Sequence, residues 1–197
     1  MHRVVALVAS EVVAFDLAIP AQVFGREPDL YTWAVCAPEP GPVPTENGFD
    51  ILVPHGLEAL TPADTVIVPG IGDRARPLPA AALDALRAAA ERGARVASIC
   101  TGAFVLAAAG ILDGRRATTN PAALDDLREH RTVDVVAARL VDDGDIVTAG
   151  APACGLDLGI HLAGRIGGPE LAEAAARELQ YELPSDRPGL QPVGQSA

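Results

Sequence analysis

Short apolar runs alternate with amphipathic stretches along this chain. Runs rich in β-branched residues, typical of buried strands, occur at residues 3–9, 32–37, 64–68 and 95–99. A helical pattern over residues 14–24 lies between the first two runs, with Pro20 expected to bend it. A second helical pattern over residues 79–92 precedes the last run, and this helix is expected to end at Gly93. Strands separated by helices predict an α/β sandwich with a mostly parallel sheet and right-handed crossovers.

The last third of the chain predicts a hairpin and two closing helices. Apolar runs at residues 133–141 and 145–149 flank an Asp-Asp-Gly turn, the pattern of a small β-hairpin. Residues 153–165 and 169–182 then show helical patterns, the first of them apolar enough to be buried.

Proline and glycine mark the irregular segments. Residues 38–44 are rich in proline and predict a loop, followed by a short edge strand at residues 50–53. We find no internal repeat and expect a single domain over residues 1–182. The tail at residues 183–197 carries three prolines and is expected to be loosely ordered.

One junction stands out for its chemistry. The run that ends at Ile99 stops at Cys100, and a small-residue helical pattern begins at once with Thr101 and Gly102. This is the sequence form of a strand-to-helix elbow, with the thiol held at the turn. A helix N-terminus favours thiolate over thiol, so a reactive thiol is expected at Cys100. The alternative is a small buried hydrophobic residue, as many free cysteines are.

Composition excludes several classes of function. The chain has 197 residues and a net charge of −11, which argues against direct nucleic-acid binding. All 15 basic residues are arginine, so a lysine Schiff base is excluded. No apolar run is long enough for a membrane span, and the apolar N-terminus reads as a first strand rather than a signal peptide. A cytoplasmic protein is expected.

Cysteine and histidine positions predict neither a disulfide framework nor a metal site. Cys36, Cys100 and Cys154 form no CxxC pair and are expected to be free thiols. Four histidines occur outside any ligand spacing, and His161, within an apolar helix, is expected to be a satisfied core histidine. No metal and no cofactor are predicted.

Five segments give the chain a close resemblance to the DJ-1/PfpI superfamily. Within it, the chain is most similar to the N-terminal domain of AraC-type transcriptional regulators, with isonitrile hydratase as a near relative. The resemblance implies a flavodoxin-like three-layer sandwich and a homodimer, with residues 14–24 and the hairpin around Gly144 as candidate contacts. The segments that carry it are residues 15–24, 66–70, 98–110, 112–119 and 142–148.

The resemblance also assigns roles in a site. Cys100 matches the family nucleophile, and Asp16 matches the acid beside it. A carboxylate next to a thiolate should have a raised pKa and stay protonated, which suits a general acid. A helix N-cap is the alternative for Asp16.

The Gly70-Ile71-Gly72 turn ends a buried strand at the carboxyl edge of the sheet, where α/β proteins bind ligands. The resemblance implies that the backbone N–H groups of Ile71 and Thr101 form an oxyanion-type pocket. The Thr101 hydroxyl could also bind a substrate, or Thr101 could be an ordinary first residue of a helix.

The chain departs from the family pattern at three places. Asn120 stands where relatives commonly have histidine, and an amide cannot shuttle protons near neutral pH. Thr101 stands where the protease branch has histidine, so we expect no peptidase. The loop over residues 148–155 is altered, so Ala151 is expected to line a pocket of changed specificity. Cys154 in that loop is either a resolving thiol for Cys100 or, more plainly, a small residue in a close-packed helix start.

Three functions follow from the resemblance. The first is a ligand- or redox-sensing module related to AraC-type regulators, which in a complete regulator precedes a helix-turn-helix domain. The second is an isonitrile hydratase-like enzyme with Cys100 as nucleophile and Asp16 as general acid. The third is another thiol-dependent activity of the glyoxalase or deglycase type, which usually needs the histidine that Asn120 replaces.

Overall fold

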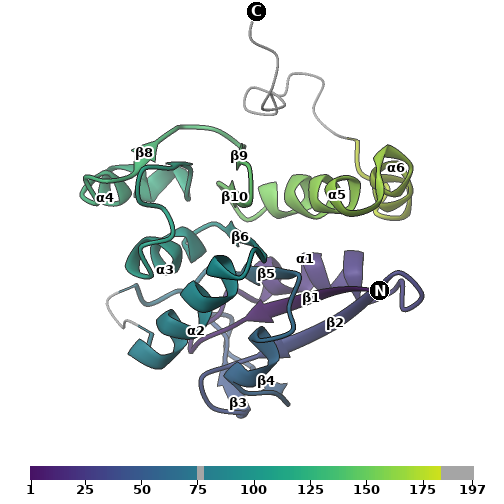
Figure 1. Ribbon diagram of the computed structural model, residues 1–197, viewed down its shortest axis with the longest axis horizontal. Helices are drawn as coiled ribbons and strands as arrows, with labels where there is room; N and C mark the ends of the chain where they lie inside the picture. Colours follow the sequence, from purple (N-terminus) through teal and green to yellow (C-terminus); the bar gives the residue numbers. More distant parts are fainter. Residues whose placement is uncertain (75–77, 183–197) are drawn as a thin grey trace, which may run out of the picture.

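A six-stranded sheet forms the centre of the molecule (Figure 1). The computed structural model describes residues 1–74 and 78–182. Five of the six strands run parallel, and the edge strand β9 pairs antiparallel with β10. In spatial order the strands are β2 (Tyr31–Cys36), β1 (His2–Leu7), β5 (Thr65–Val68), β6 (Arg95–Ile99), β10 (Ile146–Ala149) and β9 (Leu140–Asp143).

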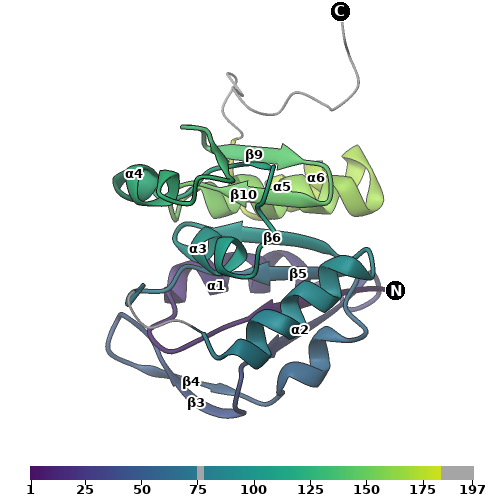
Figure 2. The same cartoon turned by 60° about the vertical axis from the view of Figure 1, so that its left-hand side comes forward.

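Helices cover both faces of this sheet, as Figure 2 shows. One face packs on α2 and α3, through core residues such as Leu86 and Leu106. The other face packs on α1, α5 and α6, with Phe24 and Leu158 in its core. The helices are α1 (Ala14–Phe24), α2 (Ala80–Glu91), α3 (Gly102–Ala108), α4 (Leu124–Arg128), α5 (Cys154–Gly167) and α6 (Pro169–Glu178), with two 3-10 turns, Leu57–Leu60 and Pro121–Ala123.

Burial on both faces explains why the strands read as continuous apolar runs. Every residue of β5 and β10 is buried, which is the pattern of a parallel sheet between two helical layers. The predicted flavodoxin-like α/β fold, the 14–24 helix, the 95–99 strand and the hairpin are confirmed. Helix α1 continues through Pro20, and α5 is largely buried, as predicted.

The prediction of a loop at residues 38–44 was wrong in part. Gly41–Pro44 forms strand β3, which pairs antiparallel with β4 (Asp50–Val53) in a separate two-stranded sheet. Proline is tolerated there because β3 has a partner on only one side and need not donate from every residue. Val43 points into a small core with Val53 and Leu17.

The prediction of a strand over residues 133–141 was also wrong for most of its length. Only Asp134–Val135 (β8) pairs, with Arg116–Ala117 (β7), before β9 begins at Leu140. The backbone between them bonds to loops instead: the Ala138 carbonyl accepts from Thr118 Oγ1 at 3.0 Å and the Arg139 carbonyl accepts from Gly150 N at 2.9 Å. The predicted tail, residues 183–197, lies outside the described residues.

Candidate functional site

Cys100 occupies the turn between β6 and α3. Its φ of +54° is in the left-handed region, which non-glycine residues rarely adopt and which often marks functional turns. The Cys100 N–H donates to the Ala149 carbonyl at 2.9 Å, and Thr119 Oγ1 donates to the Cys100 carbonyl at 2.8 Å. Both backbone groups of the strained residue are therefore held by neighbouring segments.

Gly102 makes the tight approach after the turn possible. A Cβ at this position would lie 2.2 Å from the Val68 carbonyl oxygen and 2.8 Å from that of Pro69. Only glycine lets α3 begin this close to the carboxyl end of β5.

The Cys100 thiol is buried beside an amide. Asn120 Nδ2 donates to Cys100 Sγ at 3.2 Å, while Asn120 Oδ1 accepts from Ala122 N at 3.0 Å. The Ala122 contact orients the amide so that its NH2 group faces the sulfur. Asn120 is therefore in contact with the thiol.

The expectation of a thiolate is not supported. Burial raises the pKa of Cys100 above its ordinary value, and the neighbouring Asp16 carboxylate raises it further. Hydrogen bonds from Asn120 and Thr101 lower it, but burial is the largest effect.

Asp16 is fully buried in the first turn of α1. Its Oδ2 accepts from Gly70 N at 3.0 Å, and its Oδ1 has no partner among the described residues. Burial raises the pKa of Asp16 to about 7, with a further upward effect from Glu46, while the Gly70 hydrogen bond lowers it. The raised pKa agrees with expectation, but its main cause is desolvation rather than repulsion by a thiolate. The N-cap alternative is wrong, because Val13 holds that position.

The Gly70-Ile71-Gly72 turn joins these groups. A Cβ on Gly70 would lie 2.6 Å from Asp16 Oδ2 and 3.1 Å from Thr101 Oγ1, so the turn passes between the two side chains. Ile71 N donates to Thr101 Oγ1 at 2.9 Å, and that hydroxyl donates to the Ile71 carbonyl at 2.8 Å. The Ile71 N–H expected in an oxyanion pocket is thus engaged by Thr101. Gly72 N, likewise, donates to the Glu11 carbonyl at 2.8 Å.

The altered loop lies against the same core. Ala151 is half-buried and packs on the apolar cluster that includes Cys100 and Cys154. Cys154 is buried at the start of α5, and Cys36, Cys100 and Cys154 are free thiols, as predicted. His161 is satisfied by Asp142 Oδ2 at 2.7 Å.

Two contributors were missed from the sequence. Thr119 anchors the Cys100 carbonyl, and its place next to Asn120 in the motif was the available signal. Glu46 raises the pKa of Asp16 although the two residues are distant in sequence. The turn after β3 is tied to the segment before α1, because Glu46 N donates to the Val12 carbonyl at 3.2 Å. No sequence pattern relates these distant positions.

Two features are absent from residues 1–74 and 78–182. No group of three or more His, Cys, Asp or Glu side chains there could hold a metal ion. No helix in that part of the chain is both long and apolar enough to cross a membrane.

Residues 2–163 match the DJ-1/PfpI family. The chain belongs to this family. It is 33% identical to the HTH-type transcriptional regulator CdhR of Pseudomonas aeruginosa over 171 residues. This aligned region covers 85% of this chain and 51% of the regulator. It is also 33% identical to the isonitrile hydratase of Pseudomonas putida, over 89% of this chain and 76% of that protein.

A crystal structure of an AraC family transcriptional regulator from Pseudomonas putida has the same fold. Its TM-score is 0.80 at 22% identity, covering 91% of this chain and all of that one. Of its regulator relative CdhR, by contrast, the chain spans about half the length. The predicted relationship of this DJ-1/PfpI domain to AraC-type regulators and to isonitrile hydratase is confirmed.

Proposed function

We propose that this DJ-1/PfpI domain is a ligand-sensing module, in which a small molecule binds against Cys100, Asp16 and Asn120. The observation that carries the proposal is the Asn120 contact with Cys100 Sγ at 3.2 Å. An amide donates and accepts hydrogen bonds but cannot relay a proton near neutral pH, so this contact suits binding better than turnover.

The protonation of the site favours ligand sensing over redox sensing. Redox-sensor cysteines are accessible and ionise easily, whereas Cys100 is 4% exposed and burial raises its pKa. Below a pH of about 7, Asp16 is protonated and its unpartnered Oδ1 can take part in hydrogen bonding to a ligand. A small, polar, uncharged ligand fits these groups best.

Isonitrile hydratase activity is the second candidate, favoured by a carboxyl group of pKa about 7 that acts electrostatically on the thiol. As the Cys100 sulfur forms a bond to the isocyanide carbon, the thiol proton would pass to the Asp16 carboxylate, which would deliver it to that carbon. Water would then add to the carbon. One water proton ends on nitrogen, and the other passes through Asp16 to the sulfur as the C–S bond breaks, which releases the N-substituted formamide and restores the thiol.

An assay with a small alkyl isocyanide distinguishes the sensing role from hydratase activity. We would follow formamide for the parent protein and for Cys100→Ala and Asp16→Asn. The sensing proposal expects no more than one equivalent of product. Multiple turnovers that both variants lose would overturn it and make the protein a hydratase.

Binding is tested directly by a thermal-shift screen of small polar metabolites. A sensor should be stabilised by a compound that leaves Cys100→Ala unaffected. Cys36→Ala is the matched control, since Cys36 is a buried free thiol on β2. If no compound separates these variants in a broad screen, the sensing role at Cys100 is refuted.

A further inference from the structure

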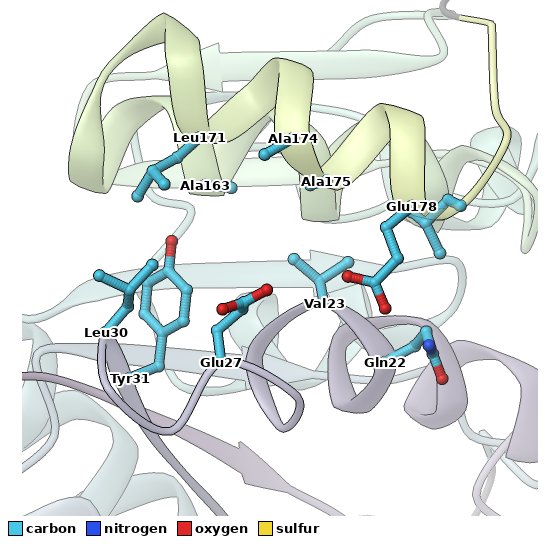
Figure 3. A pocket seen from close by; sticks show the side chains of 11 residues that line it. Gln22, Val23, Glu27, Leu30, Tyr31, Ala163, Leu171, Ala174, Ala175 and Glu178 are labelled. Carbon is cyan, nitrogen blue, oxygen red and sulfur yellow. The ribbon is translucent and has the colours of Figure 1, made fainter.

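A cavity lies on the α1/α5/α6 side of the sheet, remote from the thiol. It is a pocket of about 150 Å³ between α6, the end of α1 and the turn that leads into β2 (Figure 3). Tyr31, which lines it, opens β2, whereas Cys100 follows the carboxyl end of β6. The two sites are therefore at opposite edges of the sheet.

The floor of this pocket is aliphatic. Val23 comes from α1, Ala163 from α5, and Leu171, Ala175 and Leu179 from α6 and its end. Pockets for drug-sized ligands measure about 300–1,000 Å³, so this one suits a smaller molecule with a short hydrocarbon part.

Two carboxylates face each other across the opening. Figure 3 shows Glu27, from the turn before β2, and Glu178, from the last turn of α6, pointing toward the same space. Glu27 is held in place because its carbonyl accepts from Leu30 N at 3.0 Å and Tyr31 N at 2.9 Å. Glu178 is partly neutralised by Arg26, at 3.0 Å. The opening therefore carries a net negative charge.

A polar group is aimed into the pocket without a partner. The Tyr31 side chain is 4% exposed, its ring packs edge-on against Phe24, and its hydroxyl points toward Leu171 and Ala163 in Figure 3. No described residue forms a hydrogen bond with this hydroxyl. The hydroxyl oxygen keeps some accessible surface, so it is open to the pocket and can form a hydrogen bond with a ligand or water there.

We propose that this pocket binds a small alkylammonium ion. The hydrocarbon chain would lie on the leucine and alanine floor, and the ammonium group would lie between Glu27 and Glu178. The Tyr31 hydroxyl would accept a hydrogen bond from an ammonium N–H.

Isothermal titration with n-pentylammonium chloride tests the site. Saturable binding at one equivalent is expected, and pentanoate, of equal length and opposite charge, should not bind. Affinity should rise about four-fold for each added methylene from propyl to pentyl, as the apolar floor is covered. Failure of the ammonium ion to saturate, or equal binding of pentanoate, would overturn the proposal.

Variants distinguish specific binding of the ammonium ion in this pocket from its general electrostatic attraction to an acidic protein. Glu27→Gln and Tyr31→Phe should each weaken binding about five-fold. Arg26→Gln should strengthen it, because Glu178 loses its competing partner. Glu173→Gln is the control: it removes an α6 carboxylate that pairs with Arg177 outside the pocket and should change nothing. Equal losses in Glu27→Gln and Glu173→Gln would refute the site, with thermal melting to check that each variant folds.

Discussion

The hydroxyl of Thr119 donates to the carbonyl oxygen of Cys100 at 2.8 Å, and this contact ties the loop after α3 to the strained residue at the elbow. Both groups are buried, so the bond is not replaced by water when it is lost.

Replacing Thr119 by valine should therefore destabilise the fold. A buried carbonyl left without a partner costs about 1–3 kcal/mol in the free energy of unfolding, measured by urea denaturation. Thr119→Ser keeps the hydroxyl and should remain within about 1 kcal/mol of the parent. Equal losses in both variants would show that the methyl group, not the hydrogen bond, is what matters.

Asp16 should make stability depend on pH. Its folded pKa of about 7 is above its ordinary value of 3.8, so the folded state holds the proton more tightly than the unfolded state. The stabilisation of the folded state by this bound proton is fully present below pH 4 and is lost as the pH rises through 7. About three pKa units correspond to about 4 kcal/mol at most. Urea unfolding from pH 4 to 8 should show the parent losing stability relative to Asp16→Asn, and parallel profiles would contradict the assignment.

The reactivity of Cys100 should respond in opposite directions to its two polar neighbours. Asn120→Ala removes a hydrogen bond to sulfur and should raise the thiol pKa further, whereas Asp16→Asn removes a like charge and should lower it. The pH dependence of iodoacetamide alkylation, read at Cys100 by peptide mass spectrometry, measures both shifts. Burial raises the pKa of Cys36 to about 12, so its alkylation should stay low throughout and serves as an internal reference.

Gly102→Ala should be strongly destabilising. The new Cβ would lie 2.2 Å from a backbone oxygen in β5, which cannot move without shifting the central sheet. Overpacking of this kind costs about 1–3 kcal/mol or more. The control is Ala108→Gly in the same helix, at an exposed position, where only helix propensity changes and the loss should be about 1 kcal/mol. Thermal melting of the two variants makes the comparison, and a Gly102→Ala melting point near the parent's would contradict the packing argument.

Local patterns identified the elements whose environment is uniform along their length. Helix α1 and strand β6 were predicted with their observed bounds, because an apolar strand buried on both faces or a helix on a sheet leaves a regular signal. Strand β3 left no such signal, since its prolines are tolerated only because its partner is on one side. The segment at residues 136–139 has strand-like composition but bonds to loops, which its sequence could not indicate.

By itself, the sequence determined the α/β class, the elbow that presents Cys100 and, through the family resemblance, most of the residues that lie around it. The charge state of that site was decided only by the tertiary structure. Asp16 has its raised pKa because α1 is pressed against the Gly70 turn and buries the carboxyl group. Burial raises the pKa of Cys100, and the hydrogen bonds from Asn120 and Thr101 do not offset it. Such effects depend on which distant segments exclude water from a group, and no local pattern encodes desolvation.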